Sequence, residues 1–145
     1  MDDLDNWPRM VQIAWLLYDF KGNLIESKNY IIKPEGFDIP EELQQLMEKA
    51  DYLVAHNMSF DEKIVGAEFL RKEMDNIIDL KKKICTMQCS TDICMIDGPY
   101  GYKWPKLSEL YYQLFGKEFN DAHNALNDIN ATAECFWEMK RLFLI

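Results

Sequence analysis

The length, composition and charge of the chain limit what it can be. Its 145 residues, 48% hydrophobic and 28% charged, suit one globular domain that buries a core of its own. The formal net charge of −9 argues against a protein that holds nucleic acid by broad neutralisation of phosphates. It leaves open an enzyme that meets phosphates through divalent cations, because such sites are built from carboxylates. The basic residues 81–83, Lys103 and Lys106 offer local contacts, although a solvated face is favoured for the first group.

The sequence favours a cytoplasmic location. No apolar run approaches the length of a membrane span, and the first residues, MDDLDNWPRM, are acidic, unlike a signal peptide. Cys85, Cys89 and Cys94 follow the spacing C-x3-C-x4-C, without the C-x2-C knuckle or the nearby histidine of a zinc site. We therefore expect a cytoplasmic protein without a membrane segment, in which these cysteines and Cys135 are free thiols.

The first half of the chain alternates strands and helices. Residues 10–34, MVQIAWLLYDFKGNLIESKNYIIKP, predict two strands joined by a tight turn at 21–23. The first of them is apolar on both faces, which predicts a place inside a sheet. A short helix is expected over 39–50, a buried strand over 51–57 and a second helix over 60–74.

The second half is mainly helical around one long loop. A brief extended segment is expected over 84–90, followed by a loop over 91–105, TDICMIDGPYGYKWP, whose length inside a compact domain suggests a functional role. Residues 106–116 predict a helix closed by Gly116, and residues 125–139 predict the last helix. A hairpin followed by strands that alternate with helices indicates an α/β sheet covered by helices.

One residue of the last helix does not follow its amphipathic pattern. At 3.6 residues per turn Asp128 projects at the edge of the apolar arc, between Cys135 and Met139. The apolar arc comprises Ala125, Ile129, Thr132, Ala133, Phe136 and Met139. A carboxylate that points toward a core needs a chemical reason to do so.

Two short segments of the chain share one pattern. HNMSFD places His56 and Asn57 at the carboxyl end of a strand and Asp61 in the first turn of the next helix. HNALND places His123 just before a helix and Asp128 one turn inside it. Strand ends that face helix starts are where α/β sheets bind their ligands. Two carboxylates gathered there would repel one another unless cations lay between them, and hard oxygen donors prefer Mg²⁺ or Mn²⁺.

Each of these residues also has a structural interpretation. Asp61 is a favourable acid in the first turn of a helix, and His56 with Asn57 can cap the junction between strand and helix. His123 can be a surface histidine, and Asp128 can pair with a lysine. Taken singly, the structural interpretations are favoured. The joint pattern favours a metal site in which a neutral imidazole takes a proton from an attacking water.

The joint pattern resembles the DEDDh branch of the DnaQ-like 3′–5′ exonucleases, relatives of the proofreading subunit of bacterial DNA polymerase III. LVAHNMSFD is similar to the second motif of that family, and HNALNDINATAECF to its third, the H-x4-D motif. PRMVQIAWLLYDFKGNLIESKNYIIKP resembles its second and third strands, and GYKWPKLSELYYQLFG the helix before the third motif. The resemblance extends from about residue 7 to about residue 140.

The resemblance implies a ribonuclease H-like fold, a mixed sheet with flanking helices, in one domain over residues 1–145. It implies hydrolysis of phosphodiester bonds from the 3′ end of DNA or RNA with two Mg²⁺ or Mn²⁺ ions. Asp61 and Asp128 would bind metal and His123 would be the general base. His56 has a less certain role as a neighbour of the motif, and the same holds for Asn57.

The expected substrate is a single strand or a frayed 3′ end, and a DNA polymerase or another replication or repair protein is an expected partner. Bases could stack on Phe60, Tyr100, Tyr102 or Trp104. The same aromatic side chains are also candidates for the core, which is the favoured prediction for Phe60 and Trp104.

The chain departs from the family at its first motif. That motif is Asp-x-Glu on a first strand, ahead of the region of Trp7, where MDDLDNWPRM predicts only a loop. Two of the four expected carboxylates are thus absent, and the missing strand belongs near the middle of the family's sheet. A truncated chain, a natural degenerate form, or a dimer that swaps a strand would each explain this. The alternative function is a catalytically inactive module that binds nucleic acid or another partner.

Overall fold

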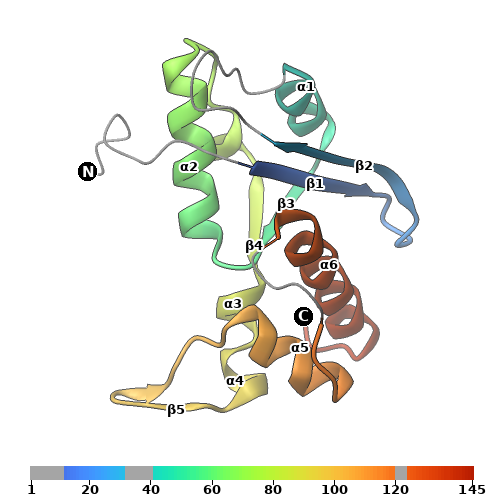
Figure 1. Ribbon diagram of the computed structural model, residues 1–145, viewed down its shortest axis with the longest axis vertical. Coiled ribbons are helices and arrows are strands. Elements are labelled where there is room, and N and C mark those ends of the chain that lie inside the picture. The colour runs from blue at the N-terminus through green and yellow to red at the C-terminus, as the bar shows by residue number, and fades with distance from the viewer. Residues whose placement is uncertain (1–11, 32–40, 120–123) are drawn as a thin grey trace.

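The computed structural model describes residues 12–31, 41–119 and 124–145 (Figure 1). None of the helices in these ranges is long and apolar enough to cross a membrane. The first described elements form the predicted hairpin, in which β1 (Gln12–Tyr18) pairs antiparallel with β2 (Leu24–Ile31). Asp19 closes the turn, because its carboxylate accepts hydrogen bonds from the backbone N–H groups of Lys21 and Asn23, both at 2.9 Å.

The middle of the chain forms a β-α-β unit. Helix α1 (Glu41–Lys49) precedes β3 (Tyr52–Ala55), and α2 (Met58–Arg71) leads through the short helix η2 (Ile78–Leu80) to β4 (Lys82–Cys85). Strands β3 and β4 pair in parallel. Both predicted helices of this region and the position of the predicted strand are confirmed. The prediction that this strand is buried is wrong, because Tyr52 is exposed and the other three residues are only partly buried.

The last part of the chain is helical around a small hairpin. Its elements are α3 (Thr86–Cys89), α4 (Thr91–Cys94), β5 (Asp97–Gly98), β6 (Gly101–Tyr102), α5 (Leu107–Phe115) and α6 (Ala125–Arg141). The prediction of an extended segment over 84–90 is wrong beyond Cys85. There the chain turns into α3, and the Ser90 hydroxyl donates a 2.6 Å hydrogen bond to the Thr86 carbonyl oxygen. The loop predicted over 91–105 contains α4 and the β5–β6 hairpin.

The strands form three two-stranded sheets, β1–β2, β3–β4 and β5–β6. In the part of the chain that the structure describes, β1 pairs only with β2 and β3 only with β4. The prediction that β1 lies inside a sheet is therefore not met by the described strands. Its apolar character has another reason, because the first core and α6 both pack on this strand.

Two hydrophobic cores hold the elements together. The first contains Ile13 and Trp15 of β1, Leu43 of α1 and Phe69 of α2, with Leu53 of β3 packed against it. The second lies between α5 and α6 and contains Leu110, Tyr111, Ala131, Cys135 and Met139. Helix α6 contacts both α5 and β1, so this one element connects the two cores (Figure 1).

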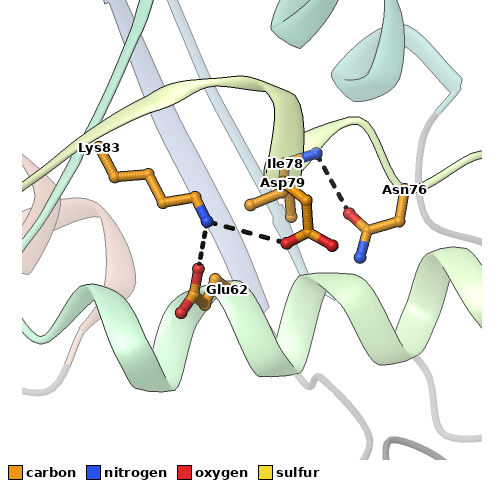
Figure 2. A network of polar contacts seen from close by, with 5 residues as sticks. All are labelled: Glu62, Asn76, Ile78, Asp79 and Lys83. Carbon is orange, nitrogen blue, oxygen red and sulfur yellow. Dashed lines mark hydrogen bonds and ion pairs between the residues drawn. The ribbon is translucent and has the colours of Figure 1, made fainter.

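The three consecutive lysines after η2 have structural partners. Lys83 Nζ lies 2.7 Å from Glu62 Oε2 on α2 and 3.8 Å from Asp79 Oδ1, and Figure 2 shows the ammonium group between the two carboxylates. Lys81 Nζ donates to the carbonyl oxygen of Glu48 at 3.0 Å. This lysine group therefore ties β4 to the neighbouring helices.

Candidate active site

The junction between β3 and α2 depends on a strained residue. Asn57 has φ 70° and ψ 57°, in the left-handed region that asparagine tolerates better than most residues. It is the N-cap of α2, but its side chain makes no capping hydrogen bond. The sequence interpretation that this side chain caps the helix is therefore wrong. Its backbone instead turns the chain sharply from the end of the strand into the helix that carries Asp61.

His56 connects three distant segments. Its Nε2 lies 2.9 Å from the carbonyl oxygen of Pro105, and its Nδ1 lies 2.9 Å from Thr86 Oγ1. A carbonyl oxygen only accepts, so Nε2 carries the proton and Nδ1 accepts from the hydroxyl in the neutral ring. Burial lowers the pKa of His56, although the bond to Pro105 opposes the shift, and the neutral form is favoured. Both ring nitrogens of His56 are thus hydrogen-bonded within the protein.

Asp61 stands in the first turn of α2. Its side chain reaches solvent, yet the protein atoms around it displace enough water to raise the pKa of the carboxyl to about 6. A helix N-terminus would lower this pKa, so desolvation is the larger effect. Among the described residues no lysine or arginine forms an ion pair with Asp61. A nearby divalent cation would relieve the cost of ionising this group.

Asp128 stands in the first turn of α6. The N-terminus of this helix is capped, because the Asn124 side chain accepts hydrogen bonds from the N–H groups of Leu126 and Asn127 at 3.0 and 3.4 Å. The buried face of α6 comprises Ala131, Thr132, Cys135 and Met139. Asp128 lies four residues before Thr132, so it falls in line with that face and not at its edge. The sequence predicts that Asp128 points toward the core, and its side chain is indeed half-buried.

The sequence-predicted site is only partly within the described residues. Helix α3 contacts both β3 and α6, so the strand that precedes Asp61 and the helix that carries Asp128 share one neighbour. His123 lies outside the described residues. Phe60, beside Asp61 on α2, is 49% exposed and Trp104 is 60% exposed. The prediction that these two aromatics belong to the core is therefore wrong.

The two candidate carboxylates are the kind of ligand that a divalent cation prefers, but they are too few for two cations. Asp61 and Asp128 supply carboxylate oxygens, which Mg²⁺ and Mn²⁺ prefer. Within residues 12–31, 41–119 and 124–145, no three His, Cys, Asp or Glu side chains gather into a group that could hold a metal ion. Two carboxylates can contribute to one cation. They are too few for the two cations that the resemblance implies.

Comparison with known families decides the relationship. A family model described as exonuclease, of the RNase T type, matches residues 29–136, about three quarters of the chain. The chain belongs to this exonuclease family. The match covers the segments of Asp61 and His123–Asp128 and begins inside β2, so β1 lies outside it. No curated protein and no solved structure matched the chain.

Membership of the exonuclease family confirms the predicted family and the α/β ribonuclease H-like fold. It also gives the chain a nuclease function in general, with nucleic acid as the substrate. Sequence reasoning missed the two partners of His56, Thr86 and Pro105. They lie 30 and 49 residues away in the chain, and no local sequence pattern predicts contacts over such separations.

Proposed function

We propose that this exonuclease family member removes nucleotides from the 3′ ends of DNA or RNA. The observation that carries the proposal is the family match across both motif segments. The equivalent placement of Asp61 and Asp128 supports it, because each carboxylate stands in the first turn of its helix. The proposal treats residues 1–145 as one domain.

In this proposal the chain's own residues have separate tasks. Asp61 and Asp128 hold Mg²⁺ or Mn²⁺. The bound cation would stabilise negative charge that develops on the phosphate. His123 accepts the proton of the attacking water. His56 holds the β3–α2 junction in place through its bonds to Thr86 and Pro105.

A second candidate function follows from the small number of carboxylates. With two acidic ligands in the described residues, the chain would be a catalytically inactive module that binds nucleic acid, or a partner such as a DNA polymerase. A copy that supplied a further strand in a dimer would instead complete the site. The two candidate functions differ in whether nucleotides are released.

A degradation assay tests the proposal. The 145-residue chain is incubated with 5′-labelled single-stranded DNA or RNA and Mn²⁺ or Mg²⁺, and the products are separated by length. A ladder that shortens from the 3′ end is expected. Loss of a general base typically costs about 10²- to 10⁴-fold in rate, and His123→Ala should lose activity on that scale. Asp61→Asn should also be strongly impaired.

The matched control is Asp92→Asn, which removes an exposed carboxylate in the first turn of a different helix, α4. This variant should degrade DNA at the parent rate. Equal activity of the parent, His123→Ala and Asp61→Asn would contradict the proposed catalytic roles. Binding without degradation by the parent would establish the inactive module instead.

A further inference from the structure

The β5–β6 hairpin is held in shape by its backbone. The N–H of Lys103 donates to the carbonyl oxygen of Ile96 at 2.8 Å and closes the base of the hairpin. Gly101 has φ 114°, a conformation that L side chains rarely adopt. Residues 98–104 line a hollow of about 420 Å³. The chain thus maintains a defined concave surface on an element whose strands have only two residues each.

This hairpin exposes three aromatic rings. Tyr100 is fully exposed, Trp104 is 60% exposed and Tyr102 is 49% exposed. Three large rings within five residues bury little surface, so they contribute little to folding. Exposed aromatic clusters of this kind mark interaction surfaces. Base stacking needs such free ring faces, and it tolerates any sequence because every base has a π-face.

The hairpin is anchored to the candidate active site. Directly after exposed Trp104, Pro105 is fully buried, and its carbonyl oxygen accepts the hydrogen bond from His56. His56 stands five residues before Asp61, at the start of the turn into α2. This partly buried hydrogen bond connects the aromatic hairpin to the junction that precedes Asp61.

The charge of the hairpin suits a polyanion only modestly. In a chain of net charge −9, the hairpin and the residues that follow it, 97–106, contain Asp97, Lys103 and Lys106. Glu109, however, lies 2.9 Å from Lys103 Nζ and accepts a hydrogen bond from the N–H of Lys106 at 3.1 Å. Its carboxylate offsets part of the positive charge. Stacking should therefore dominate over phosphate contacts, and binding should depend weakly on salt.

We propose that the β5–β6 hairpin, with Tyr100, Tyr102 and Trp104, is a stacking platform for the unpaired bases of a single-stranded nucleic acid. The identity of the ligand rests on the proposed function, since that function requires a nucleic-acid strand next to Asp61. The platform selects single strands, because the ring faces of paired bases are covered inside a duplex.

Binding in the absence of cleavage tests the platform. Labelled DNA and RNA oligonucleotides of about ten nucleotides, single-stranded or annealed, are titrated with the chain in EDTA and followed by fluorescence anisotropy. Each of Tyr100→Ala and Trp104→Ala should weaken single-strand binding by about 5- to 150-fold. Trp104→Phe should retain most of the affinity, since it keeps a stacking ring. Duplex should bind more weakly than single strand.

The control is Phe20→Ala, which removes a 78% exposed aromatic from the β1–β2 turn, on the opposite side of the molecule (Figure 1). It should bind like the parent. Tyr100 is fully exposed, so its loss should leave the melting temperature unchanged and exclude misfolding as the cause. A parent that does not bind, or hairpin variants that bind as the parent does, would overturn the platform even if cleavage occurs. Lack of cleavage with hairpin-dependent binding would contradict only the nuclease proposal.

Discussion

At the scale of the single residue, Asp61 is a candidate metal ligand whose charged form is disfavoured in the folded protein. Its carboxylate meets solvent and lies in a helix first turn, yet its pKa is raised to about 6 by desolvation. Lys83 pairs with Glu62, the residue after Asp61, and with Asp79 (Figure 2). Functional sites retain such unfavourable charges because the ligand, and not the fold, compensates them.

Asp61→Asn should therefore stabilise the metal-free protein at neutral pH. The pKa is about 6 in the folded state, against 3.8 for an ordinary aspartate, so the folded state binds the proton more tightly. The stability that this proton provides is present below about pH 4 and is lost as the pH rises toward 6. Melting temperatures of parent and variant in EDTA should diverge over this interval and stay apart above it. Contact with solvent will keep the difference below the full effect of the shift.

Two further measurements make that result specific. Asp92→Asn, at an exposed position of α4, should show no such pH-dependent gain. Mn²⁺ should raise the melting temperature of the parent more than that of Asp61→Asn, because a ligand of the folded state stabilises it by mass action. Equal stability of parent and Asp61→Asn at pH 7 would contradict the desolvated state of this carboxylate.

At the scale of the element, α6 is positioned by its N-terminal cap and one buried face. Asn124 caps its first turn, and the face with Thr132, Cys135 and Met139 packs on α5 and its neighbours. Asp128 sits where the cap and this buried face meet. The geometry of the candidate ligand therefore depends on a cap outside the catalytic residues.

Asn124→Ala should lower the free energy of unfolding by about 1 kcal/mol, since two backbone N–H groups lose their acceptor. It should also reduce nuclease activity, because the first turn that carries Asp128 would fray. Urea unfolding measures the first effect and the degradation assay the second. Asn124→Asp should restore both, since aspartate caps equally well.

The matched control lies in the same helix. Asn130 is exposed in the middle of α6, and Asn130→Ala should be neutral or slightly stabilising, because alanine is the better helix former. A loss of stability in Asn130→Ala as large as that in Asn124→Ala would show that the cap is not the cause.

At the scale of the whole molecule, the described residues contain two hydrophobic cores, which α6 connects through its contacts with β1 and α5. Phe69 is central to one and Leu110 to the other, and both are fully buried. Tyr18 of β1 and Trp137 of α6 lie with ring centroids 5.5 Å apart, which joins the hairpin to the helical part. This continuity predicts that the chain unfolds as one cooperative unit.

Phe69→Ala and Leu110→Ala should each lower the free energy of unfolding by roughly 2 to 5 kcal/mol, because both leave a cavity in a core. In each variant the transitions followed by tryptophan fluorescence and by circular dichroism should coincide. Two separate transitions, with each substitution moving only one of them, would show that the cores belong to independent domains.

Elements whose conformation is set by interactions between residues close in sequence could be predicted from the sequence. The β1–β2 turn follows from the Asp19–Asn23 hydrogen bonds, and the end of α5 from Gly116, which has φ 68°. The α3 helix could not be predicted, because the local sequence around Thr86 and Ser90 indicates an extended segment. Their burial against the end of β3 determines their conformation.

The sequence by itself determined the family and the two motif segments, because the spacing from His56 to Asp61 and from His123 to Asp128 is fixed along the chain. Only the tertiary structure decided that His56 is hydrogen-bonded to Pro105, that Asp128 lies in line with a buried face, and that Trp104 is exposed. The physical reason is the range of the interactions. Hydrogen bonds of turns and caps act between near neighbours, whereas burial and desolvation depend on which distant segments pack together.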